Sequence, residues 1–134
     1  MSLLETCASV AIISTVVFFA APSLIRARES YELNLTARQV AEKIAWTRIK
    51  AISRNRNCRL RVTSEVSYVI ECGGSVWQTD ETVTLPRGFQ IAATAAPQFH
   101  RHGNAAPAGS ITIWDRHLNS RRVVVNITGR VKVE

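Results

Sequence analysis

The sequence lacks the short motifs that would point to catalysis. It contains no glycine-rich phosphate-binding loop. The stretch His100-Arg101-His102 holds two histidines, but no cysteine or carboxylate stands near it at a recognised metal-ligand spacing. The Ser, His and Asp residues of the C-terminal part do not form a recognisable triad. We therefore predict that the protein is not an enzyme and that it holds no metal or cofactor.

Acidic residues are also scarce. The 134 residues include 10 Asp and Glu against 17 Lys and Arg, which gives a formal net charge of +7. This balance favours an anionic partner, which could be nucleic acid, acidic lipid or an acidic neighbouring subunit. The hydrophobic content of 46% is sufficient for a folded core, and the length indicates one domain in addition to an N-terminal segment.

Charge is almost absent from the N-terminal segment. Glu5 is the only charged residue before Arg26. About 20 apolar residues in a helix span about 30 Å, which is the thickness of a bilayer core. No basic stretch precedes this run and no small-residue cleavage site is evident after it, so it does not read as an ordinary secretory signal. We predict a membrane-spanning helix over residues 1–25.

The three cysteines bear on the compartment of the domain. Cys58 and Cys72 flank two short strand-like stretches; they would form a disulfide in an oxidising compartment, or would otherwise be two reduced, buried residues. Cys7 remains as a lone thiol. A disulfide implies an exported domain, whereas Arg26 and Arg28 would place the C-terminal side in the cytoplasm by the positive-inside rule. A basic leader that is later removed would decide in favour of export.

Residues 26–57 have the pattern of an amphipathic helix. No Gly or Pro interrupts them, and Asn55-Arg56-Asn57 indicates the end of the helix. We interpret Trp46 as a packing anchor. The apolar positions at helical spacing, which predict a face that packs on a sheet, are Leu33, Ala37, Val40, Ile44 and Ala51.

From residue 58 the pattern changes to short strands. Apolar and basic residues alternate in the first of them, which is typical of a half-buried strand. We expect later strands at 66–72, 111–114, 122–128 and 130–133, a surface loop over 92–109, and turns at Asn119-Ser120 and Thr128-Gly129. The sequence thus predicts an α+β fold in which a long N-terminal helix packs on antiparallel sheet, with a membrane segment 1–25, an amphipathic segment 26–57 and a β-rich domain 58–134.

The N-terminus resembles the mature N-terminus of type IV pilins and pseudopilins. The stretch Met1-Ser2-Leu3-Leu4-Glu5 has the fifth-position glutamate of that family, and Pro22 stands where many members have a proline. Met1 departs from the pattern, because phenylalanine is usual there, and Cys7 is unusual in this region.

The rest of the chain resembles FimT-type minor pilins and the H-type pseudopilins (GspH) of type II secretion. The likeness rests on the end of the helix, TRIKAISRNRNCRLRV, on the run of short strands, and on Gly129-Arg130-Val131-Lys132 near the C-terminus. The resemblance implies a pilin fold and a structural role. It leaves open whether the chain is a major or a minor subunit, and whether it belongs to a pilus or to a secretion pseudopilus.

The resemblance also implies roles for three residues. In this family a prepilin peptidase removes a basic leader, and the new terminal residue, here Met1, is N-methylated. Glu5 then pairs with the N-terminal amine of another subunit, which fixes the register between apolar helices, and Pro22 permits a local unwinding on assembly. The chain would be anchored in the inner membrane with its domain in the periplasm. The assembly machinery would then insert it into a homo-oligomeric filament, or one with other pilin subunits, in the periplasm or outside the cell.

A second hypothesis is DNA capture during uptake, which a Gly-Arg-x-Arg motif near the C-terminus is linked to in FimT-type proteins. Arg130 and Lys132 occupy the two basic positions here, and Arg121 and Arg122 could join them on one hairpin. The alternatives are a solvated basic face or one that meets acidic residues on the next subunit. A third hypothesis is a single-pass anchored domain unrelated to filaments.

Overall fold

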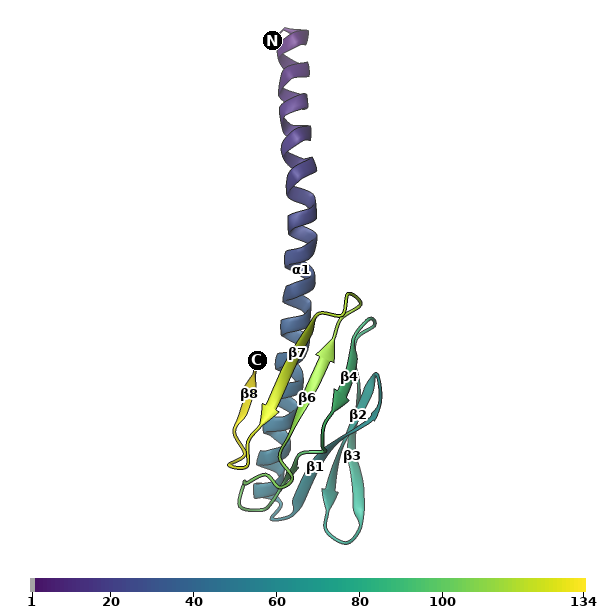
Figure 1. The fold of residues 1–134 in the computed structure, drawn as a ribbon, viewed down its shortest axis with the longest axis vertical. Helices are drawn as coiled ribbons and strands as arrows, with labels where there is room; N and C mark the ends of the chain where they lie inside the picture. Colours follow the sequence, from purple (N-terminus) through teal and green to yellow (C-terminus); the bar gives the residue numbers. More distant parts are fainter. Residues whose placement is uncertain (1) are drawn as a thin grey trace. The chain divides into compact units, whose positions relative to one another are not determined.

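The computed structural model describes residues 2–134, and it divides the chain into two compact units, Met1–Glu32 and Leu33–Glu134 (Figure 1). Helix α1, Leu3–Ser53, supplies all the regular structure of the first unit and begins the second. Met1 lies outside the described residues, and so do the expectations about its amine and its methylation.

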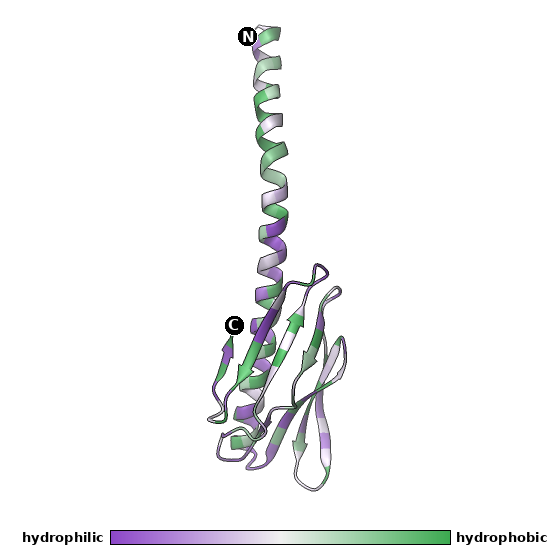
Figure 2. Cartoon of the chain, in the orientation of Figure 1, coloured by the Kyte–Doolittle hydropathy of each residue, from purple (hydrophilic) through white to green (hydrophobic). Residues whose placement is uncertain are grey.

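The first unit is an apolar stretch of helix. Every described residue up to Arg28 is exposed, and the helix continues through Pro22. Figure 2 shows that this stretch is mostly hydrophobic until polar residues appear toward its end. The hydroxyls of Ser9, Ser14 and Thr15 donate to backbone carbonyls four residues earlier, at 2.8, 2.7 and 2.5 Å. These hydrogen bonds satisfy the polar groups within the helix, which suits an apolar environment.

The second unit joins the rest of α1 to two antiparallel sheets of four strands each. We expected antiparallel sheet, and the described residues form two sheets rather than one. The first sheet has the order β3-β2-β1-β5 and the second the order β4-β6-β7-β8. The strands are β1 (Asn57–Ser64), β2 (Ser67–Gly73), β3 (Trp77–Thr84), β4 (Gln90–Ala93), β5 (Gln98–Phe99), β6 (Gly109–Trp114), β7 (Ser120–Val125) and β8 (Val131–Val133).

One hydrophobic core unites the second part of α1 with both sheets. The predicted helix face is buried at all five positions, from Leu33 to Ala51. Alternate residues of the strands meet it, including Leu60 and Ile70 of the first sheet and Ile113 of the second. Burial of each such side chain stabilises the fold by about 1.5–3 kcal/mol. The α+β fold predicted from the sequence is therefore confirmed.

Ion pairs connect α1 to the edge strand β3. Lys43 pairs with Glu81, and Asp80 accepts from both Lys50 and Arg54, with an Arg54 Nη1 to Asp80 Oδ1 distance of 2.9 Å. The Lys50 ammonium and the Arg54 guanidinium, which donate to this carboxylate, lower the pKa of Asp80. Charges along β3 also protect an exposed sheet edge from pairing with other strands.

Three local expectations differ from the structure. Trp46 is 49% exposed rather than a packing anchor, because two residues after the buried Ile44 the helix has turned by about 200°. The helix ends at Ser53 rather than near 57: Asn55 adopts a positive φ of 51°, and the Arg56 N–H donates to the Ala51 carbonyl at 3.1 Å. The expected loop 92–109 contains the short strand β5, which pairs with β1.

Candidate functional site

Glu5 lies in the first turn of α1 with an exposed side chain. Ser2 precedes the helix, and its hydroxyl accepts the Leu4 N–H at 3.2 Å, as an N-cap residue does. A carboxylate near a helix N-terminus is favoured by the helix dipole. Within residues 2–134 the Glu5 carboxylate makes no ion pair. It is therefore available to a cationic group from another molecule.

The second part of α1 also exposes apolar side chains. Leu35, Trp46, Ile49 and Ile52 are all between 43% and 52% exposed. Leu35, Trp46 and Ile49 lie on the face of the helix that points away from the buried residues Val40 and Ile44, since helical spacing at about 100° per residue puts the two sets on opposite sides. We call these three residues the outer stripe.

The four basic residues proposed for nucleic acid do not lie on one face. Arg121 is half-buried, and its Nε donates to Asn34 Oδ1 of α1 at 2.6 Å. Arg122 follows it on β7 and so points to the opposite side of the sheet. The register pairs Lys132 with Val124, two residues after Arg122, which places Lys132 on that same outer side.

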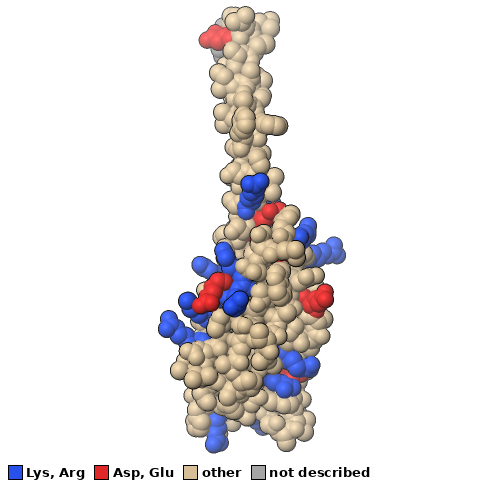
Figure 3. Space-filling model, viewed as in Figure 1, with Lys and Arg blue, Asp and Glu red and all other residues tan. Residues whose placement is uncertain are grey.

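The outer side of β7 and β8 also contains an acidic residue. Figure 3 shows Lys and Arg side chains gathered over these strands around an acidic side chain. Lys132 Nζ pairs with Glu134 Oε1 at 3.1 Å. Arg122 and Arg130 are exposed, and neither makes a side-chain ion pair within the described part of the chain. The structure thus places Arg122 and Lys132 on one side of the sheet and Arg121 on the other, and it pairs Lys132 with Glu134.

Gly129 of the Gly-Arg-Val-Lys stretch has a structural role in the turn between β7 and β8. Its φ is +80°, and a Cβ there would stand 2.1 Å from the Gly103 carbonyl oxygen. That oxygen accepts a hydrogen bond from Arg48 Nε at 2.8 Å. The close approach of two backbone segments therefore requires glycine at this position.

Cys58 and Cys72 form a disulfide, with an S–S distance of 2.05 Å. They stand directly opposite each other in the β1–β2 pairing, and both are buried. Cys7 is free and exposed.

A buried carboxylate on the first sheet escaped the sequence analysis. Glu71 is 4% exposed, and it accepts from Arg61 Nη2 at 2.7 Å and from Arg59 Nε at 2.8 Å. The hydrogen bond from Arg61 is the main cause that lowers the pKa of Glu71. The Arg59 guanidinium lies over the Trp77 ring, 4.1 Å from its centroid. The sequence does not reveal this cluster, because Arg59 and Arg61 belong to β1 and Glu71 to β2, and only the pairing register of the two strands brings them together.

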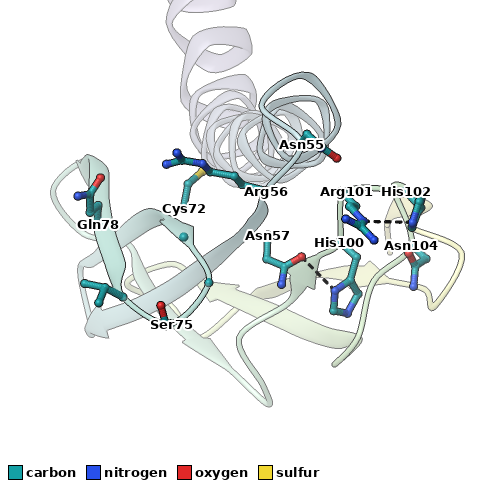
Figure 4. Close-up of a pocket in the computed structure, with 13 residues that line it drawn as sticks. Asn55, Arg56, Asn57, Cys72, Ser75, Gln78, His100, Arg101, His102 and Asn104 are labelled. Carbon is teal, nitrogen blue, oxygen red and sulfur yellow. Dashed lines mark hydrogen bonds between the residues drawn. The ribbon is translucent and has the colours of Figure 1, made fainter.

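A hollow of about 770 Å³ opens among three loops of the second unit (Figure 4). We call it the polar bowl. Its lining comes from the segment 55–57 after α1, from residues 72–76 and Gln78 around the turn between β2 and β3, and from residues 100–102 and Asn104 after β5. The pair His100 and His102 lies on its wall, and among the described residues no group of three or more His, Cys, Asp or Glu is placed to hold a metal ion.

The fold has solved counterparts among pilin-like proteins. The minor pseudopilin EpsH of the type II secretion system of Vibrio cholerae is 13% identical, with a TM-score of 0.66 over 77% of this chain and 96% of that one. The type IV minor pilin FimU of Pseudomonas aeruginosa is 16% identical, with a TM-score of 0.66 over 79% of this chain and 90% of that one. No protein-family model and no curated protein sequence matches the chain. The resemblance to pilins and pseudopilins is thereby confirmed at the level of the fold.

Proposed function

We propose that this chain, which has the fold of minor pilins and pseudopilins, is a structural subunit of a type IV pilus or pilus-like filament. The observation that carries the proposal is the exposed apolar part of α1, where an 18-residue window has a mean hydropathy of 2.1 and no buried residue. Such a surface needs a covering of lipid or of other helices. We propose that the apolar helix uses both coverings in succession: the membrane before assembly, and a bundle of helices from other subunits afterwards.

The placement of Glu5 supports the same proposal. A carboxylate inside a lipid or helix-bundle environment costs several kcal/mol unless a partner is present. The N-terminal amine of a neighbouring subunit is positively charged and would serve as a counter-ion for the Glu5 carboxylate. We propose that this pair sets the register between subunits, after a prepilin peptidase has exposed the amine of Met1 and that amine has been methylated.

The disulfide supports export of the domain. Disulfides persist in oxidising compartments, and Cys58 and Cys72 are joined. We therefore propose a periplasmic orientation of the second unit before assembly. This orientation runs against the positive-inside expectation from Arg26 and Arg28, which a removed basic leader would outweigh.

Replacing Ile49 by aspartate tests the role of the outer stripe. Ile49 is 52% exposed in the chain, so Ile49→Asp should leave the melting temperature of the detergent-solubilised protein unchanged. In a filament the same side chain would be covered, and placing a charge there should lower the amount recovered in sheared filaments about tenfold or more.

The matched control is Val66→Asp in the turn between β1 and β2, where Val66 is 45% exposed. We expect this variant to enter filaments at the wild-type level. Equal recovery of wild-type protein and Ile49→Asp would contradict a buried outer stripe.

A second candidate function is DNA capture by the outer side of β7 and β8. Arg122 and Arg130 favour it, because both are exposed without an ion pair in the described part of the chain. We expect Arg130→Gln/Lys132→Gln to abolish measurable binding of duplex DNA by the full chain in detergent. Glu134→Gln should strengthen binding, because it releases Lys132 and removes a repelling charge.

The control for that experiment is Arg87→Gln/Arg116→Gln, which removes equal charge from exposed residues of the β3–β4 and β6–β7 loops. Binding should fall steeply as salt rises, with a log–log slope near −0.9 per phosphate contact. Wild-type affinity of the Arg130→Gln/Lys132→Gln variant at equal salt would rule out this assignment.

A further inference from the structure

We propose that the polar bowl binds an acidic saccharide, through a carboxylate held by arginine and hydroxyls held by the neutral side chains of the wall. The proposal does not depend on filament assembly or on DNA capture. It rests on how the bowl is built, on its charge, and on the balance between its charged and neutral groups.

The walls of the bowl are held by specific contacts. Asn57 Oδ1 and His100 Nδ1 are 3.2 Å apart and connect the start of β1 to the loop after β5. That loop closes on itself, since the His100 N–H donates to the Asn104 carbonyl at 2.9 Å. On the other side Gly73 permits the tight turn into β3, because a Cβ there would stand 2.0 Å from the Val76 carbonyl oxygen.

The bowl carries positive charge without a neutralising acid. Its lining includes Arg56 and Arg101 and no Asp or Glu. The nearby carboxylate of Asp80 is already paired with Lys50 and Arg54. Arg56 has no ion-pair partner among residues 2–134.

Arg101 uses one of its guanidinium nitrogens within the wall of the bowl, since its Nε donates to His102 Nε2 at 3.3 Å. The terminal nitrogens of both guanidinium groups remain available, and their planar fork matches the two oxygens of a carboxylate.

The neutral polar side chains that line the bowl outnumber its two arginines, and this favours a ligand that carries several hydroxyl groups. Asn55, Asn57, Asn104, Gln78 and Ser75 each carry a group that both donates and accepts hydrogen bonds. Figure 4 shows Gln78 and Ser75 on one side, Asn104 on the other, and Asn57 between them. Saccharide hydroxyls also donate and accept, whereas phosphate oxygens at neutral pH mainly accept.

Nucleic acid fits the bowl less well. No Phe, Tyr or Trp side chain is among its lining residues, so the bowl lacks the large aromatic surfaces on which single-stranded bases usually stack. A duplex presents a convex row of phosphates, which calls for cations spread along a face, and the bowl holds two arginines within a concavity. A sugar acid with one carboxylate and several hydroxyls matches both the charge and the hydrogen-bonding groups.

The test uses the full chain in detergent and three probes: galacturonic acid, its trisaccharide, and neutral galactose. Binding is followed by calorimetric titration. We expect saturable binding of the acidic trisaccharide and none of galactose. Binding of the monomer at comparable affinity would assign the site to a free sugar acid, and binding of the trisaccharide alone would assign it to a polymer; both outcomes support the proposal.

Variants locate the site. Arg56→Gln/Arg101→Gln should weaken trisaccharide binding about tenfold or more, because hydrogen bonds to charged groups are the strong ones. Arg38→Gln/Arg87→Gln removes the same charge outside the bowl and should leave the affinity within about twofold, as expected for exposed charges far from a site. Both variants should keep the wild-type melting temperature.

Three results would overturn the proposal: no saturable binding of either acidic probe, equal binding of galactose, or equal loss of affinity in the two arginine variants. The last of these would show a general effect of net charge. If the chain assembled into filaments normally but bound no acidic saccharide, the saccharide proposal would be wrong and the proposed filament function would be unaffected. The two proposals can therefore be refuted independently.

Discussion

Replacing Glu5 by glutamine should nearly remove the chain from sheared filaments while leaving its level in the membrane unchanged. Glutamine keeps the size and the helical propensity of the side chain but loses the charge. In the proposed filament the neighbouring N-terminal amine would then be left without its counter-ion in an apolar bundle. Breaking a buried pair in this way costs about 3–5 kcal/mol, which corresponds to a loss of incorporation of more than about a hundredfold.

The matched control for Glu5 is Glu65→Gln. Glu65 is an exposed acid in the turn between β1 and β2, and its loss changes the net charge by the same amount. We expect wild-type incorporation for this variant, measured by quantitative mass spectrometry of filament and membrane fractions. If Glu5→Gln and Glu65→Gln were recovered equally in filaments, Glu5 would be an ordinary interfacial residue that caps the helix.

Removing the disulfide should destabilise the domain strongly. Cys58 and Cys72 are separated by 14 residues, and a cross-link closing a loop of about this length stabilises a domain by about 3 kcal/mol. For a domain of about 100 residues, the double variant Cys58→Ser/Cys72→Ser should therefore melt at least about 10 °C lower. The serine hydroxyls would also need partners in a buried place, which adds to the loss.

Thermal unfolding of the detergent-solubilised chain, followed by circular dichroism, measures this effect. Cys7→Ser is the control, because Cys7 is a free and exposed thiol in the apolar part of α1. We expect the melting temperature of Cys7→Ser to equal that of the wild-type chain. A double serine variant that melted within about 2 °C of wild type, a change that corresponds to less than 1 kcal/mol, would mean that packing alone holds β1 and β2.

The features that the sequence predicted best depend on local periodicity. The helical spacing from Leu33 to Ala51 identified the face that the core buries. The alternation of Leu60 and Val62 with arginines identified a half-buried strand. These patterns are readable because a side chain's direction depends only on its position in the element.

The features that were missed depend on contacts between distant segments. Strand β5 has two residues, which is too short for a period to appear, and it exists because it pairs with β1. Arg121 faces α1 and Arg122 faces outward, a one-residue difference that only the sheet register resolves. The size of Trp46 predicts burial, but its angular position on the helix places it in the outer stripe.

The proposed binding surfaces show the same division between local and distant information. Glu5 could be singled out from the sequence, since one acid in an apolar run is conspicuous. The polar bowl could not, because its residues come from three loops that are separated along the chain and that meet only when both sheets form. The arginines Arg56 and Arg101 carried no signal of their own among the many basic residues.

The measurement that tests the filament proposal most directly is mass spectrometry of sheared filaments, with the N-terminal peptide of this chain read in the same sample. We predict that the chain is present in the filament fraction and that its N-terminal peptide begins at Met1 with one added methyl group. A chain found entirely in the membrane fraction, with an N-terminus that is unmethylated or preceded by further residues, would contradict the proposal.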